Sequence, residues 1–159
     1  MTESVADTET KFLSAEELYI TEEMRCGLVQ TLADLQSGAL KHVPFGSLWS
    51  SLVEGRNLSQ DVKGRTFNLG QWKIPLSCGT VCCIGGHAEL AMGLPAFSMD
   101  RHSQKLAHHE GKHGLHDLFY GRQENQTVVF SLDRVTASQA AKALHNYLTT
   151  GRPDWHKFT

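Results

Sequence analysis

The sequence predicts a mainly α-helical protein: a compact single-domain bundle with irregular loops and at most a short β element. The clearest helix lies near the C-terminus, where Thr136 and Gln139 have the spacing of a capping box. Apolar residues follow at helical spacing as far as Leu148, and Gly151 and Pro153 then supply a typical end. Short connections between amphipathic segments favour helix-on-helix packing over a sheet-based architecture.

A second helix is expected near the N-terminus. Ser14 and Glu17 form another capping box, and Gly38 is a plausible stop. The residues between them place one apolar stripe at helical spacing: Ile20, Met24, Leu28, Leu32 and Leu35. Because residues 1–13 are small and polar, we expect a flexible N-terminal arm at 1–13 and a single helical domain at 14–159.

The middle of the chain gives weaker signals. Glycine and proline make residues 55–77 irregular. Helices are expected over Phe45–Glu54, over part of 99–109 and from about His113 to Tyr120, and short strands over Thr66–Leu69 and Val128–Leu132.

Composition excludes several classes of function. The formal net charge is -2 and the basic residues are scattered, which argues against binding to duplex nucleic acid. No apolar run approaches the roughly 20 residues that cross a membrane, and the N-terminus lacks a basic and apolar export signal. The protein has four cysteines, three of them between Cys78 and Cys83, a poor layout for disulfides. We therefore expect reduced thiols and a cytoplasmic location, with the oligomeric state left open.

The order of several motifs resembles that of a group of small, uncharacterised bacterial and phage proteins. The pattern comprises Phe67–Trp72, then Cys78–Ala88 (CGTVCCIGGHA), then Leu118–Phe119, and finally a helix followed by Thr150–Trp155 (TGRPDW). Cys78 and Cys83 match the two cysteines of this group, Cys82 is extra, and many members carry Trp at the position of His87. The resemblance implies a common fold unit and allows a phage or bacterial accessory role, without implying an activity.

The CGTVCCIGGH segment is the first candidate site. If Thr80 caps a helix over Val81–Gly93, then Cys83 occupies its third position and shares a face with His87. The free N–H groups of such a helix start lower thiol pKa values and favour anions.

Four interpretations of this segment stay open. Cys83 could be a nucleophile with His87 as its base; Cys78, Cys83 and His87 could form part of a zinc site; or the helix start could bind a phosphate or carboxylate. Alternatively, the cysteines simply pack as small apolar side chains. The residues expected to hold a ligand here are Cys78, Gly79, Thr80, Cys83, Gly86, His87 and Trp72.

A histidine cluster is the second candidate site. His109, Glu110 and His113 spell H-E-x-x-H, the spacing that zinc peptidases use on one helix, with the glutamate activating a zinc-bound water. His116 or Asp117 is close enough in sequence to be a third ligand. Gly111 weakens the required helix, so the competing interpretations are a solvated polar surface and a metal or pH-sensing site without catalysis.

Together these observations favour a non-enzymatic binding or interaction module that holds a protein partner or a small anionic ligand at the CGT segment. The alternatives are a zinc-dependent hydrolase at Glu110 with its flanking histidines, or a thiol enzyme or redox sensor at Cys78 or Cys83. No cofactor is required by the first hypothesis, whereas zinc is required by the second.

Overall fold

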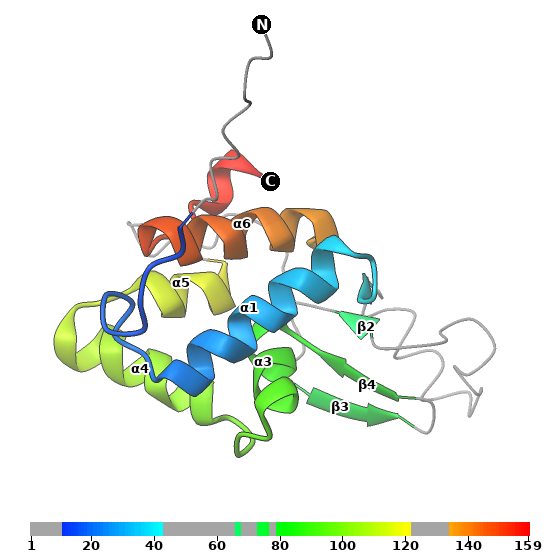
Figure 1. Ribbon diagram of the computed structural model, residues 1–159, viewed down its shortest axis with the longest axis horizontal. Helices are drawn as coiled ribbons and strands as arrows, with labels where there is room; N and C mark the ends of the chain where they lie inside the picture. The colour runs from blue at the N-terminus through cyan, green and yellow to red at the C-terminus, as the bar shows by residue number, and fades with distance from the viewer. Residues whose placement is uncertain (1–10, 43–65, 68–72, 77–78, 122–133) are drawn as a thin grey trace, which may run out of the picture.

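The computed structural model describes residues 11–42, 66–67, 73–76, 79–121 and 134–159, and this part of the chain is mainly helical (Figure 1). Its helices are α1 (Glu22–Gln36), α3 (Ile84–Met92), α4 (Ser98–Glu110), α5 (Gly114–Tyr120), α6 (Ala137–Thr150) and the short 3-10 helix η3 (Trp155–Lys157). The predicted mainly α-helical fold is confirmed, as are the helices expected over 99–109 and 113–120. The expected elements at Phe45–Glu54 and Val128–Leu132 lie outside the described residues.

A small sheet lies beside the helices, on the side away from α4 and α5 (Figure 1). Its strands are β1 (Lys41–His42), β2 (Thr66–Phe67), β3 (Lys73–Leu76) and β4 (Gly79–Cys82), in the order β1-β2-β4-β3. The β1–β2 and β2–β4 pairs are parallel, and β3–β4 is antiparallel. The strand expected from Thr66 is present, whereas β3 and β4 fall where the sequence predicted a loop and a helix start.

The N-terminal helix begins later than its capping box predicts. Glu17 N–H does donate to Ser14 Oγ at 3.2 Å, but the turn ends at Tyr19, whose φ is +58°. Thr21 then caps α1 by accepting a hydrogen bond from Met24 N–H at 3.2 Å. A capping box can be completed by a single turn, so the pattern marked a turn here and the helix start was predicted wrongly. The end is confirmed, since α1 stops at Gln36 and Gly38 has φ +75°.

The core forms where α1 crosses α3 and where α6 packs against α1. A Cβ on Gly27 of α1 would lie 2.5 Å from the carbonyl oxygen of Ala88 in α3, so only glycine permits this close approach.

The predicted apolar face of α6 is buried, and its predicted capping box and left-handed Gly151 are confirmed. Leu13 N–H, from the segment expected in the N-terminal arm, donates to the Leu148 carbonyl at 2.7 Å.

One further contact fixes the C-terminal end of the molecule. Trp155 is fully buried and its Nε1–H donates to the carbonyl oxygen of Asp117 at 2.9 Å, which ties η3 to α5.

Within the described ranges, no helix has the length and apolar character needed to cross a membrane.

Candidate functional site

The CGT segment forms a strand where the sequence predicted a helix start. Thr80 pairs with Pro75 in the β3–β4 ladder, and α3 begins at Ile84 with Cys83 as its N-cap. The predictions that Thr80 caps the helix and that Cys83 occupies its third position are therefore wrong. The physical reason is that β4 has neighbours on both sides, β2 and β3, so the sheet takes up the backbone hydrogen bonds that a helix would need. Cys78 and Trp72 lie outside the described residues.

The start of α3 is buried in the core. Cys83 is 2% exposed and His87 is 1% exposed, and the His87 N–H donates to the Cys83 carbonyl at 3.0 Å. Gly86 is buried between them. This helix start therefore faces neighbouring protein, which is the environment of a packed, inert cysteine and not of an accessible thiol.

The H-E-x-x-H segment does not lie on one helix. Helix α4 ends at Glu110, Gly111 adopts φ +65°, and His113 precedes a new helix, α5. The prediction that His109 and His113 share a helical face is wrong, because the left-handed glycine ends the helix inside the motif.

The other members of this cluster are engaged elsewhere. His116 is 6% exposed and stacks on Tyr120 with 4.5 Å between ring centroids. Lys112 Nζ pairs with Glu110 at 3.1 Å. Among the described residues, no group of three His, Cys, Asp or Glu side chains is placed to hold a metal ion.

A pocket of about 820 Å³ lies where the α4–α5 connection meets the end of α6, and we call it the C-terminal pocket. Three segments surround it: the turn Glu17–Tyr19, the connection Gly111–Leu115 and the loop Thr150–Asp154. Its buried lining side chains are Leu18, Leu106, Leu115, Tyr147 and Pro153, and its exposed basic ones are Arg152, His113, His156 and Lys157, joined by the half-buried Lys112. Acidic side chains also line the pocket, so its accessible surface is polar and of mixed charge over a layer of buried apolar side chains.

One wall of the pocket is built by a close backbone contact. A Cβ on Gly114 would overlap the carbonyl oxygen of Gly151 and would lie 3.3 Å from Cε2 of Tyr147. Glycine at position 114 thus lets the start of α5 touch the end of α6.

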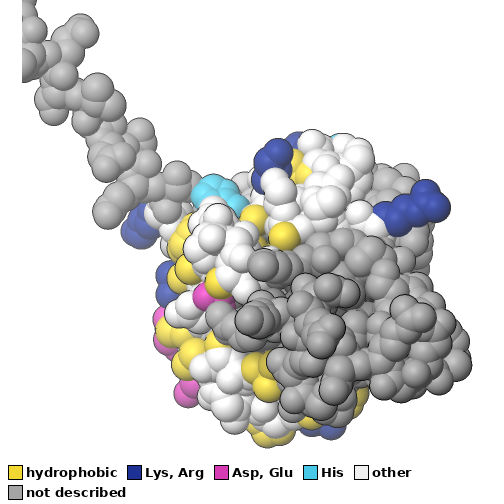
Figure 2. All heavy atoms as spheres, turned by 90° about the vertical axis from the view of Figure 1, so that its right-hand side faces the viewer, with side chains coloured by type: hydrophobic (Ala, Val, Ile, Leu, Met, Phe, Trp, Pro, Cys, Tyr) yellow, Lys and Arg dark blue, Asp and Glu magenta, His cyan; other side chains and the backbone are white. Residues whose placement is uncertain are grey.

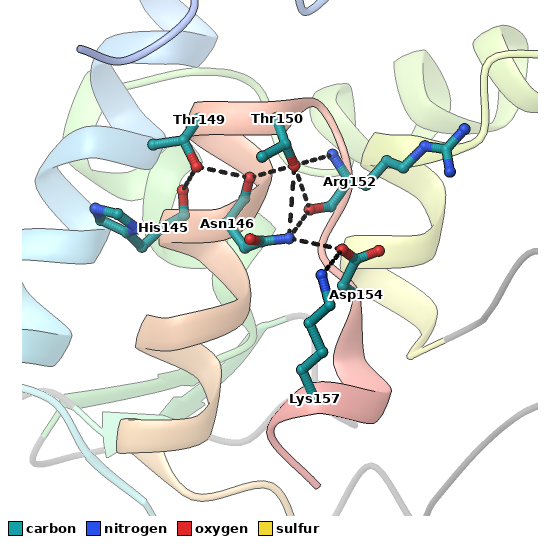
Figure 3. Close-up of polar contacts among 7 residues, drawn as sticks. All are labelled: His145, Asn146, Thr149, Thr150, Arg152, Asp154 and Lys157. Atoms are coloured by element: carbon teal, nitrogen blue, oxygen red, sulfur yellow. Dashed lines mark hydrogen bonds and ion pairs between the residues drawn. The ribbon is translucent and has the colours of Figure 1, made fainter. Parts of the chain in front are cut away.

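The other wall is held by Asn146 (Figure 3). Its Nδ2 donates to the Arg152 carbonyl at 2.7 Å and to Asp154 Oδ2 at 3.2 Å, and Lys157 Nζ binds the same Asp154 oxygen at 2.6 Å. Thr150 Oγ1 accepts from the Arg152 N–H at 3.2 Å. This network fixes the TGRPDW loop, while the Arg152 guanidinium extends away from it, on the side where α5 lies (Figure 3).

Tyr147 is the least expected residue of the pocket lining. It is 1% exposed, and its buried hydroxyl oxygen has no hydrogen-bond partner within the described part of the chain. Burial raises the pKa of this phenol above its usual value, so the group stays protonated. A buried hydroxyl without a partner costs about 1–3 kcal/mol.

Tyr19 lies at the mouth of the pocket in a strained conformation. Lys112 Nζ lies 3.4 Å from the centroid of the Tyr19 ring, and His102 Nε2 contacts the Tyr19 carbonyl at 2.8 Å. Tyr19 and Asp154 are two of the three non-glycine residues with positive φ among the described residues, and both line this pocket. Backbone strain of this kind tends to gather at ligand sites.

Three acids line the pocket: Glu17, Asp117 and Asp154. The Lys157 ammonium lowers the pKa of Asp154, and the Asn146 amide acts in the same direction. The Ser14 N–H, followed by its hydroxyl, lowers the pKa of Glu17, and these neutral donors leave its negative charge in place. The mouth therefore presents carboxylates as well as basic side chains.

Of the residues that line this pocket, the sequence indicates only His113 and Asp117 as candidate site residues. Tyr147 belongs to the predicted apolar face of α6, where its ring does pack, and Arg152 is one of the scattered basic residues. The signal that could have located the pocket is the TGRPDW motif that follows α6. On the face shown in Figure 2, the described Lys and Arg side chains stand apart from one another, in agreement with the scattered basic residues of the sequence.

Comparisons with known proteins add no relative to this description. No protein-family model, no curated protein and no solved structure showed significant similarity to the chain. The candidate site therefore rests on its own geometry.

Proposed function

We propose that the protein is a cytoplasmic, non-enzymatic binding module that holds a small anionic ligand in the C-terminal pocket. The observation that carries this proposal is Lys112 at the mouth of the pocket, whose ammonium lies over the Tyr19 ring and has only an exposed pair with Glu110. Buried polar groups are nearly always hydrogen-bonded, and the buried Tyr147 hydroxyl, without a partner among the described residues, is a second donor that a movement of the lining would present to a ligand.

The charge of the ligand is inferred from Lys112. The pocket is lined by the cations Lys112, Arg152 and Lys157 and by the acids Glu17, Asp117 and Asp154, of which Asp154 is paired with Lys157. The Lys112–Glu110 pair is well exposed, with side-chain exposures of 36% and 39%, and exposed pairs contribute only about 0–1 kcal/mol. Lys112 can therefore exchange Glu110 for a ligand anion at little cost.

This proposal keeps the class of function expected from the sequence and moves its location. The CGT segment supplies a strand and the buried start of α3, whereas the C-terminal pocket supplies volume, a donor and cations. The geometry gives no comparable support to catalysis by Cys83 or by Glu110, since the first is buried and the second pairs with Lys112.

The proposal is tested by nuclear magnetic resonance titration of the full chain with sodium benzoate, hexanoate and inorganic phosphate. Binding should shift the amide signals of Gly111–Leu115 and Thr150–Asp154, and Lys112→Met should weaken the shifts. Lys142→Met is the matched control, because Lys142 is exposed on α6 and does not line this pocket. If no anion shifts these amides, or if the shifts map to other segments, the pocket is not an anion site.

A further inference from the structure

We propose that the connection between α3 and α4 contacts an anionic lipid surface: its apolar side chains enter the headgroup region, and Arg101 and Lys105 meet the negative charge of the headgroups. This inference goes beyond the proposed function, since no residue of Leu90–Phe97 lines the C-terminal pocket. Four observations carry it: the exposed apolar side chains, the conformation of Phe97, the hydrogen bonding of the loop backbone and the charges beside the loop.

Exposed apolar side chains gather in this loop. The segment Leu90–Phe97 (LAMGLPAF) contains no polar side chain. Leu90, Met92 and Phe97 are 40%, 39% and 48% exposed, and they are three of the four large hydrophobic residues exposed in the described part of the chain. The loop projects from the lower edge of the molecule, beyond the end of α3 (Figure 1). Exposed apolar surface gathered in this way marks a contact site for a protein or a membrane.

Phe97 is held in its exposed position against its backbone preference. Its φ is +61°, which is unfavourable for a bulky side chain. The buried carboxylate of Glu89 fixes this turn by accepting hydrogen bonds from Phe97 N–H at 3.0 Å and Met99 N–H at 2.8 Å. Strain that the surrounding structure imposes in this way is characteristic of functional segments.

The backbone of the loop suits an apolar environment. The Leu94 N–H donates to the Glu89 carbonyl at 2.9 Å, and the Ser98 N–H donates to the Pro95 carbonyl at 3.1 Å. Together with the bond from Phe97 N–H to the Glu89 carboxylate, these contacts let the tip leave water without carrying those donors unpaired into lipid. Protein interfaces combine apolar contacts with hydrogen bonds across them, whereas this loop offers no polar side chain, so a lipid surface is the better match.

The charges beside the loop indicate which lipids it meets. Arg101 and Lys105 are exposed one helical turn apart on α4, and neither forms an ion pair with a described residue. Arg101 Nη2 lies 3.5 Å from the Ala96 carbonyl, which places the guanidinium against the loop. The neighbouring carboxylate, Asp100, already accepts a hydrogen bond from the Tyr120 hydroxyl at 2.6 Å. The accessible charge here is therefore positive and complements anionic headgroups.

The proposal is tested by flotation of the full chain with lipid vesicles. Vesicles of phosphatidylcholine alone are compared with vesicles of phosphatidylcholine and phosphatidylglycerol in equal parts. Each basic residue near an anionic surface contributes about fivefold to binding, so wild-type protein should bind the mixed vesicles at least about tenfold more tightly.

Variants of the apolar tip test the contact itself. Phe97→Asn removes the ring and supplies a residue that tolerates positive φ, so the variant should fold and lose about fivefold in binding to the mixed vesicles. Phe97→Leu keeps an apolar side chain and should retain most of the binding. Leu90→Gln lies on α3, outside the strained turn, and should weaken binding without affecting that turn.

Variants of the basic pair test the lipid preference. Arg101→Gln combined with Lys105→Gln should remove the preference for the mixed vesicles. Arg134→Gln combined with Lys142→Gln is the matched control, because both residues are exposed, Lys142 lies on α6 and Arg134 shortly precedes it. The control pair should leave the preference unchanged.

Several results would overturn the proposal: no binding to either vesicle, equal binding to both, or wild-type binding by the tip variants. Analytical ultracentrifugation covers the other occupant. If the protein forms a dimer that Phe97→Asn dissociates, and vesicles stay unbound, the loop joins two copies of the chain and the lipid assignment is wrong.

Discussion

Gly114, the first residue of α5, lies directly against the carbonyl oxygen of Gly151, the residue that ends α6. No side chain fits between them, and the ring of Tyr147 closes the contact from the side. This contact between two backbones joins the α4–α5 connection to the TGRPDW loop and so defines the C-terminal pocket.

Gly114→Ala should destabilise the protein, because its Cβ would overlap backbone that cannot rotate away. Overpacking of this kind costs about 1–3 kcal/mol, and chemical denaturation would measure it. His113→Ala is the control, since His113 is exposed and makes no side-chain cap hydrogen bond. Equal stability of the two variants would show that the Gly114–Gly151 contact is not constrained.

Two tyrosine substitutions should change stability in opposite directions. Tyr147→Phe removes a buried hydroxyl that has no partner among the described residues, so the free energy of unfolding should stay the same or rise by about 1 kcal/mol. Tyr120→Phe removes a 2.6 Å hydrogen bond to Asp100 and should lower it by about 1 kcal/mol. Parallel urea melts give both values, and a loss at Tyr147 equal to that at Tyr120 would contradict the unpartnered hydroxyl.

The same hydroxyl should matter at alkaline pH. Its pKa is raised by burial, so the folded state keeps the proton after the unfolded chain has released it. The contribution to stability is complete below the unfolded pKa of about 10 and is lost as the pH rises through the folded pKa. Thermal melts between about pH 8 and 11 should therefore show a shallower decline for Tyr147→Phe than for wild type, and identical slopes would argue against burial of the phenol.

Glu89 should be required for the start of α4. This carboxylate is 3% exposed and accepts hydrogen bonds from Phe97 N–H at 3.0 Å and Met99 N–H at 2.8 Å. Glu89→Ala leaves buried N–H groups without these acceptors and should cost about 2–3 kcal/mol, whereas Glu89→Gln keeps one oxygen and should cost less. Hydrogen exchange at Met99 would locate the effect, and unchanged protection of that amide in Glu89→Ala would refute it.

Asp154 should stabilise the TGRPDW loop in a pH-dependent way. Its pKa is lowered, chiefly by Lys157, so its contribution is present above the unfolded value of about 4 and disappears as the pH falls through the lower folded pKa. Asp154→Asn preserves a side chain that tolerates the positive φ of +45° found here. The wild-type advantage, less than about 1 kcal/mol for an exposed pair, should be constant from about pH 7 to 5 and shrink as the pH falls below about 4. A constant difference over this whole range would exclude the ion pair as its source.

Local rules predicted most of the helices correctly. The capping box at Thr136, the glycine at position 151 and the apolar spacing between them depend on interactions within a few residues, and the structure reproduces each one. The same rules failed at Ser14 and Thr80. At Ser14 a single turn completes the capping hydrogen bond, and no helix starts there. At Thr80 the backbone of β4 pairs with the strands β2 and β3, so this segment forms a strand in place of a helix start.

The candidate site was less predictable than the fold. Cysteines and histidines stand out in the sequence because those residue types carry chemistry, yet Cys83 is packed in the core and the H-E-x-x-H motif is split by Gly111. Tyr147 carries no such signal, since a tyrosine on the apolar face of a helix ordinarily packs in a core. Its unpartnered hydroxyl becomes evident only when the surrounding described side chains are in place.

The sequence by itself determined that this protein is mainly helical and where α1 and α6 end, because capping, glycine conformation and apolar periodicity act over short distances along the chain. Tertiary structure alone decided which residues meet: Phe67 with Cys82, Gly114 with Gly151, and Lys112 with the Tyr19 ring. Those pairs are separated in the chain and are selected by the packing of whole elements, so no local pattern of residues could specify them. The C-terminal pocket depends on the last two of these contacts.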